Sequence, residues 1–200
     1  MKNPNIFFPP KSQEHRLYDY WIWPDVFDKK ELKQLHKIFN ETNINDAIDS
    51  PAKSSKIVNL KMSPWKNFKK LLTPLDQLFL KIQQDNFGYQ IYPQYDYNYL
   101  ILNEYDGKQK GEYDWHTDSS SNYIYDIKFT LLINASLEPY EGGDFVYFKA
   151  GERHIKELNT PGNVIFFKSY LSHKVYPVTK GKRHTITLFY MGPRFVWWIN

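Results

Sequence analysis

Cysteine is absent from all 200 positions of the sequence. Its absence excludes disulfides and thiolate metal ligands, and the chain needs no oxidising compartment in order to fold. A metal ion bound to this protein would therefore have to be held by histidine and carboxylate side chains.

Long apolar runs are also missing. No stretch approaches the roughly 20 apolar residues that cross a bilayer. The apolar part of the N-terminal segment, residues 1–10, is too short for a secretory signal. We therefore expect a soluble, cytoplasmic protein that does not bind membranes. The formal net charge is only +4, which is too small an excess to indicate nucleic-acid binding.

Aromatic residues are abundant, at 18% of the chain with 16 Tyr and 14 Phe. Such residues favour β-strands with broad packed faces. Two hundred residues are enough for one domain with a substantial core. We expect a single domain over residues 1–200, in which residues 1–88 form a helical N-terminal support and residues 89–194 form the β core.

The first predicted helix runs from about Lys29 to Phe39, with Asp28 as its N-cap. Its apolar stripe contains Leu32, Leu35, His36 and Phe39, so His36 is interpreted as a packing residue. The following segment, Thr42 to Ser55, is polar and is predicted to be a surface loop.

A second helix is predicted to end near Asn86, before Gly88. Ser63-Pro64 and Thr73-Pro74 each resemble an N-cap followed by proline at the first helical position. The side chains expected to face inward are Leu75, Leu78, Phe79 and Ile82.

From residue 89 onward the pattern of apolar residues alternates, which is typical of β-strands separated by short turns. A first strand is expected at Leu17–Ile22. The later strands are expected at Tyr89–Tyr92, Tyr97–Glu104, Glu112–His116, Lys128–Asn134, Asp144–Lys149, Arg153–Glu157, Asn163–Phe167, His173–Pro177 and His184–Met191. This order predicts a mainly β protein with N-terminal helices: a double-stranded β-helix, or jelly roll, with helices packed on one sheet. The apolar tail from Phe195 to Asn200 is expected to pack on the domain or on a partner chain.

His116 and Asp118 form the most informative motif. On an extended segment, residues two apart lie on the same face. A third ligand, His173, would complete a set of two imidazoles and one carboxylate that leaves one side of an octahedral ion open. Such ligands suit Fe(II), Mn(II), Co(II) or Zn(II). A lone His-x-Asp pair is more often a surface feature, so the assignment depends on His173 and on the motifs around it.

These motifs occur in an order that resembles the 2-oxoglutarate- and Fe(II)-dependent dioxygenases of the prolyl-4-hydroxylase-like group. The matching segments are Tyr105-Asp106-Gly107, Tyr113 to Asp118, Glu141 to Phe145, Pro161-Gly162-Asn163 and His173 to Arg183. The resemblance covers roughly the second half of the chain and includes the compact bacterial and phage-type enzymes. It implies the jelly-roll fold and the metal ligands His116, Asp118 and His173.

The resemblance also implies co-substrate contacts. Arg183 would bind the 5-carboxylate of 2-oxoglutarate, assisted by Thr187, and Tyr105 matches a tyrosine that contacts the co-substrate. Leu132 stands where the family often has a further tyrosine, so Thr130 or Tyr105 would have to replace it. From the residues alone, the segment Thr179 to Arg183 has the composition of a solvated basic turn, which is the alternative to a binding role for Arg183.

The Gly181 turn is expected to bring the Arg183 strand beside the His173 strand. The paired glycines 142 and 143 are interpreted as a structural turn or bulge. The remaining histidines at 15, 154 and 184 lack the spacing of metal ligands, and His184 is expected to face away from Arg183.

The implied chemistry is hydroxylation of a C–H bond with Fe(II), 2-oxoglutarate and O2, with release of succinate and CO2 and with ascorbate as a candidate reductant. A peptidyl proline is the leading substrate prediction, while a free amino acid or a small metabolite remains open. Two other classes also remain open: a non-catalytic jelly-roll module that binds a metal or a carboxylate, and a zinc hydrolase. The hydrolase is disfavoured because no general base is evident beside the predicted ligands.

Overall fold

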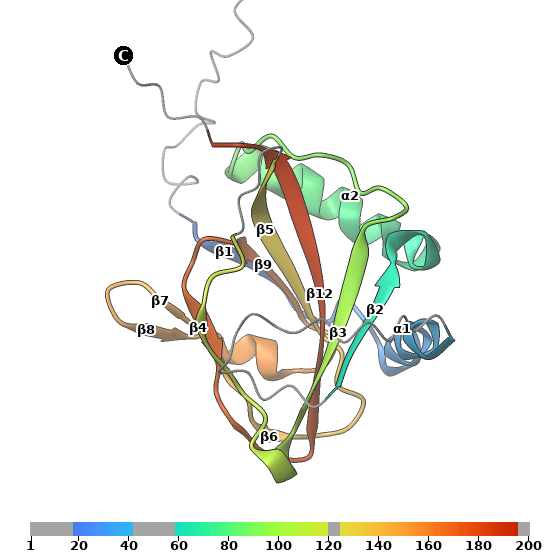
Figure 1. Ribbon diagram of the computed structural model, residues 1–200, viewed down its shortest axis with the longest axis vertical. Coiled ribbons are helices and arrows are strands. Elements are labelled where there is room, and N and C mark those ends of the chain that lie inside the picture. Colours follow the sequence, from blue (N-terminus) through green and yellow to red (C-terminus); the bar gives the residue numbers. More distant parts are fainter. Residues whose placement is uncertain (1–17, 42–58, 120–124, 196–200) are drawn as a thin grey trace, which may run out of the picture.

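The computed structural model describes residues 18–41, 59–119 and 125–195 (Figure 1). The predicted loop at 42–55, the histidine at position 15 and the tail residues 196–200 lie outside the described residues. Within the described part the protein is mainly β-sheet, with two α-helices packed on one side, as the sequence predicted.

The larger sheet has six strands in the order β1-β9-β5-β12-β3-β2, and all neighbouring pairs are antiparallel. In that order the strands span Tyr20–Trp23, Val164–Lys168, Tyr125–Asn134, Lys182–Pro193, Tyr99–Asp106 and Asn59–Pro64. The two edge strands, β1 and β2, come from the N-terminal part of the chain. The division into a support at 1–88 and a core at 89–194 stays a prediction.

A four-stranded sheet faces the larger one, in the order β4-β10-β7-β8. Its strands span Tyr113–His116, His173–Val175, Phe145–Phe148 and Glu152–His154. A two-stranded ribbon pairs β11 (Val178–Lys180) with β6 (Glu141–Gly142). Within the described residues, three short 3-10 helices occupy Trp65–Asn67, Gly107–Gln109 and Lys156–Asn159. Two antiparallel sheets stacked in this way form the double-stranded β-helix.

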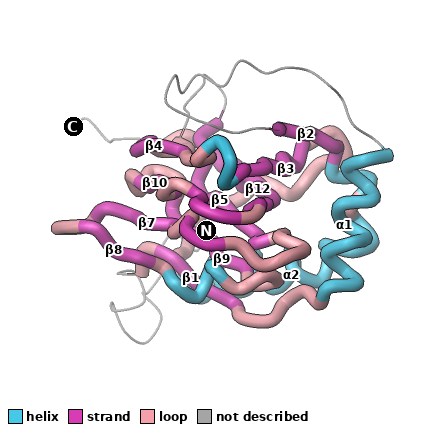
Figure 2. The backbone as a smooth tube through the Cα atoms, turned by 90° about the horizontal axis from the view of Figure 1, so that it is seen from below, coloured by secondary structure: helices cyan, strands magenta, loops and turns pink. Residues whose placement is uncertain are grey.

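Alternation along the strands divides the core into two layers. On β5, Leu131 and Ile133 face the helices, whereas Leu132 faces the smaller sheet. Because successive strand residues point to opposite faces, the same strand serves both layers. Figure 2 shows α1 at one side of the larger sheet and the β4-β10-β7-β8 sheet at the other.

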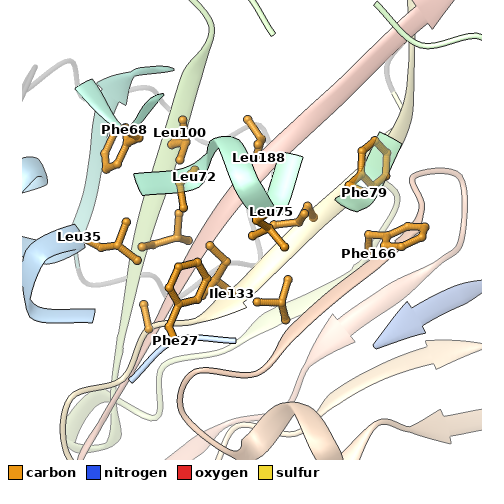
Figure 3. Packing of buried hydrophobic residues seen from close by; sticks show 14 of the residues in the cluster. Phe27, Leu35, Phe68, Leu72, Leu75, Phe79, Leu100, Ile133, Phe166 and Leu188 are labelled. Carbon is orange, nitrogen blue, oxygen red and sulfur yellow. The ribbon is translucent and has the colours of Figure 1, made fainter. Parts of the chain in front are cut away.

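The helix layer contains α1 (Lys29–Glu41) and α2 (Lys69–Asn86). Figure 3 shows how their side chains meet the sheet in one apolar cluster. The stripe predicted for α1 is confirmed, since Leu32, Leu35 and Phe39 are buried. In the described part of the chain, neither helix is long and apolar enough to span a membrane.

The inward face of α2 was predicted less well. Leu75 and Phe79 are buried, but Leu78 is 40% exposed, so its predicted inward position was wrong. Gln83 is buried instead. Its side-chain oxygen accepts the Tyr89 N–H at 3.2 Å and its backbone carbonyl accepts the Gly88 N–H at 2.8 Å. The polar side chain therefore closes the end of the helix, which explains its burial.

The two helix starts predicted from the Ser-Pro and Thr-Pro pairs were wrong. Ser63-Pro64 ends strand β2 and is followed only by a 3-10 turn. Thr73-Pro74 lies inside α2, which begins at Lys69. Phe68 and Leu72 are almost fully buried against the sheet, and this tertiary burial outweighs the hydrogen bond that Pro74 cannot donate.

The strand predicted at Tyr89–Tyr92 was also wrong, because this segment has no regular structure. It instead runs along the end of β12, where the Tyr92 N–H donates to the Met191 carbonyl at 2.8 Å. Pro93 follows directly, and a proline disfavours extension of a ladder because it lacks an N–H. The alternating aromatic pattern here reflects partial burial without strand pairing.

Gly162 joins the N-terminal part of the chain to the sheet. Its φ of +89° is in the left-handed region, and an added Cβ would lie 2.1 Å from the Phe27 carbonyl oxygen. Its own carbonyl accepts the N–H groups of Val26 and Phe27, each at 3.2 Å. Only glycine allows this close approach of two backbones. The Pro161-Gly162-Asn163 motif therefore has a structural role at this contact.

Candidate metal centre and co-substrate pocket

Three predicted ligand residues meet at one end of the smaller sheet. His116 ends β4, Asp118 follows it by two residues, and His173 begins β10, directly opposite His116 in the strand register. One potential ligand atom of each side chain lies within 4.8 Å of the other two. The Asp118 carboxylate oxygens lie 3.5 Å from His116 Nε2 and 3.4 Å from His173 Nε2.

Backbone carbonyls orient both histidine rings. His116 Nδ1 lies 2.7 Å from the Asp114 carbonyl, and His173 Nδ1 lies 2.9 Å from the Leu171 carbonyl. A carbonyl only accepts hydrogen bonds, so each Nδ1 carries the proton in these contacts. In the neutral rings the lone pair is then on Nε2, which points toward Asp118. This is the tautomer and orientation that a metal-ligating histidine requires.

The charge state also suits a metal site. Burial alone would raise the pKa of Asp118, but the neighbouring His173 and His116 and the Thr130 hydroxyl together hold it below its usual value. Burial lowers the pKa of His173, against the opposing effect of Asp118. An ionised carboxylate and a neutral imidazole are the forms that bind metal ions.

Arg183 lies on β12, on the other side of the interior from this cluster. Its side chain is 0% exposed, and none of its three guanidinium nitrogens has a hydrogen-bond partner among the described residues. Its guanidinium carbon lies 5.5 Å from the centre of the Tyr105 ring. A buried cation without a hydrogen-bonded anion is costly, and a carboxylate ligand would satisfy it.

Gly143 makes room for Arg183. A Cβ at this position, where φ is +72°, would lie 2.8 Å from Arg183 Cδ. The sequence prediction treated the paired glycines as structural and missed this contact with the pocket. A glycine pair signals an unusual backbone, but it does not say which side chain uses the space.

The predicted neighbourhood of Arg183 was wrong in one respect. Strand β12 lies between β5 and β3 in the larger sheet, whereas the His173 strand belongs to the smaller one. The turn at Gly181 does reverse the chain, but it connects β11 to β12. Arg183 and His173 therefore approach one cavity from opposite sheets, and the pocket lies between the layers.

A cavity of about 180 Å³ connects the two groups. Its lining includes all six predicted site residues, which are His116, Asp118, His173, Arg183, Tyr105 and Thr187. Burial raises the pKa of the Tyr105 hydroxyl to about 12, although Arg183 opposes the shift, so this group stays protonated at neutral pH. Thr187 pairs with Leu132 across neighbouring strands.

Leu132 also lines the cavity, and its side chain has no hydrogen-bonding group. The Thr130 hydroxyl donates to Asp118 Oδ2 at 2.7 Å. Its single proton is thus directed at the carboxylate, which leaves Tyr105 as the better placed of the two proposed substitutes for the missing tyrosine.

The other described histidines lie outside the cavity. His184 faces away from Arg183, as expected, with Nε2 2.9 Å from a Glu104 carboxylate oxygen. Its ring packs edge-on against His36 at 4.9 Å between centroids. His154 is a partly exposed partner of Asp144 at 3.1 Å.

Comparisons with solved structures show the same fold at low identity. A Pseudomonas putida prolyl-4-hydroxylase is 15% identical, with 90% of this chain and 95% of that chain covered and a TM-score of 0.62. A Trichoplax adhaerens prolyl hydroxylase, solved with a hypoxia inducible factor peptide fragment, is 18% identical, with 88% and 84% covered and a TM-score of 0.64.

A third structure is the carbocyclase SnoK from nogalamycin biosynthesis, described as non-haem and α-ketoglutarate-dependent. It is 14% identical, with 90% of this chain and 84% of that chain covered and a TM-score of 0.61. No curated protein matches the chain.

The sequence itself matches a family model over residues 100–191, the segment that runs from β3 to β12. This segment contains all six predicted site residues. Family members use Fe(II), 2-oxoglutarate and O2, and the His-Asp-His cluster found here has the donor set for that metal. Residues 100–191 therefore match the 2OG-Fe(II) oxygenase superfamily, and the protein is a 2-oxoglutarate-dependent dioxygenase.

Proposed function

We propose that the protein hydroxylates a peptidyl proline, with Fe(II) held by His116, Asp118 and His173. In the same proposal Arg183 binds the 5-carboxylate of 2-oxoglutarate, with Tyr105 and Thr187 beside it. The observation that carries the assignment is the buried, unpartnered guanidinium of Arg183, which faces the same cavity as the three candidate ligands.

The reaction balances without a further co-reactant. One atom of O2 enters the substrate as a hydroxyl, and the other enters succinate as 2-oxoglutarate loses CO2. Iron, when bound, supplies the activation of O2. The chain's own residues supply three oriented ligands, a fixed cation for the distal carboxylate and an interior shielded from water.

The polar side chains divide the cavity into two ends. The His-Asp-His cluster marks one end and Arg183 the other, and largely apolar side chains such as Leu132, Phe145 and Phe167 line the space between them. A cavity of about 180 Å³ is smaller than pockets for drug-sized ligands, which are roughly 300–1,000 Å³. It therefore suits a small dicarboxylate, and we place the primary substrate at its mouth.

The preference for peptidyl proline is supported by the two prolyl hydroxylases that share the fold. A small-molecule substrate is the second candidate, supported by the carbocyclase with the same fold. We also propose a cytoplasmic location, because a chain without cysteine needs no oxidising compartment. Ascorbate as the reductant stays a prediction.

The test of the metal and co-substrate sites is an anaerobic absorption titration, in which Fe(II) is added first and 2-oxoglutarate second. We expect a visible metal-to-ligand charge-transfer band in the wild type and none in His173→Ala. His154→Ala, which changes a histidine outside the cavity, should keep the band. A band that survives in His173→Ala would refute the ligand assignment.

The substrate is tested separately. The enzyme is incubated with Fe(II), 2-oxoglutarate and proline-containing peptides, and mass spectrometry is used to look for the gain of one oxygen atom at proline. Succinate formed in the same samples should equal the hydroxylated product. Turnover of a small amino acid with no turnover of any peptide would favour the second candidate.

A further inference from the structure

Two buried hydroxyls lie directly behind Asp118. Thr130 is on β5 and Ser169 follows the last residue of β9, so they come from neighbouring strands of the larger sheet. Both are almost completely buried, at 1% and 0% exposure. Thr130 Oγ lies 2.7 Å from Asp118 Oδ2 and 3.0 Å from Ser169 Oγ.

The direction of these hydrogen bonds follows from the chemistry of the groups. An ionised carboxylate can only accept, and a threonine hydroxyl has one proton, so Thr130 must donate that proton to Asp118. Thr130 Oγ is then the acceptor of its other bond, and Ser169 must be the donor. The two hydroxyls form a chain in which each donation polarises the next.

Ser169 also fixes the backbone of the same segment. Its carbonyl accepts the Asp118 N–H at 2.9 Å and the Ser119 N–H at 3.0 Å. Ser169 therefore holds Asp118 in two ways. Its carbonyl binds the Asp118 backbone N–H directly, and its hydroxyl is connected to the Asp118 carboxylate through Thr130. The segment is thereby anchored to the larger sheet, although His116 and His173 belong to the smaller one.

We propose that Thr130 and Ser169 are positioning residues for Asp118. Thr130 donates to Oδ2, which also lies 3.4 Å from His173 Nε2, while Oδ1 lies 3.5 Å from His116 Nε2, so the hydrogen bond fixes the plane of the carboxylate between the two histidines. A carboxylate held in this plane stays beside the two histidines and leaves the opposite side of a metal ion open for a co-substrate. This inference rests on the proposed metal site and adds to it the two residues that set the carboxylate's orientation and donor strength.

The expected effect is that of a hydrogen bond to a metal ligand, whose loss typically costs about 10–100-fold in metal affinity or activity. Thr130→Val has nearly the same shape but no proton to donate. It should weaken Fe(II) binding by about 10-fold or more. Thr130→Ser keeps the hydroxyl and should restore most of the affinity.

The experiment compares wild type, Thr130→Val and Thr130→Ser by anaerobic Fe(II) titration against a competing chelator, followed by the charge-transfer band with 2-oxoglutarate. Thr73→Val is the matched control, because its hydroxyl bonds only within α2, to the Lys69 carbonyl. Affinity falls in Thr130→Val because the carboxylate is no longer held in place for the metal ion. The carboxylate that does bind has lost its hydrogen-bond donor, so it gives more electron density to the iron and raises the energy of the iron electrons. The band of Thr130→Val should therefore move to longer wavelength, while Thr130→Ser and Thr73→Val keep the wild-type band.

The outcomes separate this inference from the proposed function. No band in the wild type would refute the metal and co-substrate assignment, and this inference with it. A wild-type band together with wild-type affinity and wavelength in Thr130→Val would overturn the positioning role alone. If Thr130→Val does not fold, Ser169→Ala replaces it, with a smaller change expected in the same direction, and an unchanged affinity and band there would also overturn the role.

Discussion

At the scale of single residues, the burial of Arg183 is the most consequential feature. The guanidinium carbon lies 5.5 Å from the centre of the Tyr105 ring and Cδ lies beside Gly143, so the position of the side chain is set by the protein rather than by a ligand. Arginine offers a planar fork that matches both oxygens of a carboxylate, whereas lysine offers a point charge on a flexible stem.

Arg183→Lys should therefore raise the KM for 2-oxoglutarate while changing kcat less. Loss of a hydrogen bond to a charged group costs about 1.5–3 kcal/mol, which corresponds to a KM increase of about 10–100-fold. Both constants are measured from the steady-state rate of succinate formation at a series of 2-oxoglutarate concentrations. Lys182→Gln is the control, because Lys182 is exposed and bonds only to Glu104 in the described structure. Equal effects of the two variants would contradict the role of Arg183.

The six predicted site residues could be named from the sequence because they belong to motifs in an order that resembles one enzyme family, and the structure places all six around one cavity. The supporting residues could not. Ser169 carries no motif, and its link to Asp118 depends on the pairing of β5 with β9, which a single sequence does not reveal. The contact of Gly143 with Arg183 likewise depends on which sheet each strand joins.

At the scale of elements, the contact between α1 and the sheet contains a titrating group. His36 Nε2 lies 2.8 Å from the Ala135 carbonyl, and its ring packs on His184. Burial lowers the pKa of His36 below its ordinary value of 6.5, with smaller contributions from His184 and Lys61 and an opposing one from the Ala135 carbonyl. The folded protein therefore favours the neutral ring.

The sign of the pH effect follows from this shift. Because the unfolded chain binds the proton more readily, the contribution of His36 to stability is present above pH 6.5 and is lost as the pH falls through the lower folded-state pKa. The melting temperature of metal-free wild type should fall between pH 7.5 and pH 5.5. His36→Gln keeps a donor but does not titrate, so its melting temperature should fall less. Parallel pH profiles for the two proteins would show that His36 does not cause the loss of stability at low pH.

Element prediction succeeded where local signals agreed with tertiary packing. The stripe of α1 and most core strands follow directly from periodicity. It failed at β2 and at the start of α2, where Ser-Pro and Thr-Pro pairs carry a local helix-start signal. The burial of Phe68 and the pairing of β2 with β3 decide the structure there, and both are long-range effects.

At the scale of the whole molecule, an aromatic cluster joins the helix layer to the sheet. The Phe79 ring stacks on Tyr190 at 3.7 Å between centroids and meets Phe166 edge-on at 4.9 Å. Residues of α2, β9 and β12 therefore share one packing unit on the face of the sheet opposite the cavity. This arrangement supports the wall of the pocket from behind.

Phe79→Ala should lower the free energy of unfolding by about 3–5 kcal/mol, because a large buried ring is removed from a close-packed layer. Leu78→Ala, the adjacent and 40% exposed position, should cost under about 1 kcal/mol. Urea denaturation of the two variants gives both values. At a temperature where both are folded, the charge-transfer band should be retained. Similar losses of stability would show that the layer is not packed as described.

Arg183 and the His116–His173 strand pair belong to opposite sheets, and both line the same cavity. The distance between the sheets therefore limits the length of a molecule that can contact both. The packed layers hold the two sheets at one separation, and the fully buried Arg183 side chain lies beside Gly143 and Tyr105. Under the proposed assignment, a 2-oxo acid with a shorter carbon chain would not reach the Arg183 guanidinium with its distal carboxylate. A longer acid would have to adopt a bent conformation in order to fit between the two sheets. Selection among such acids would then depend on the distance between two sheets rather than on any single contact.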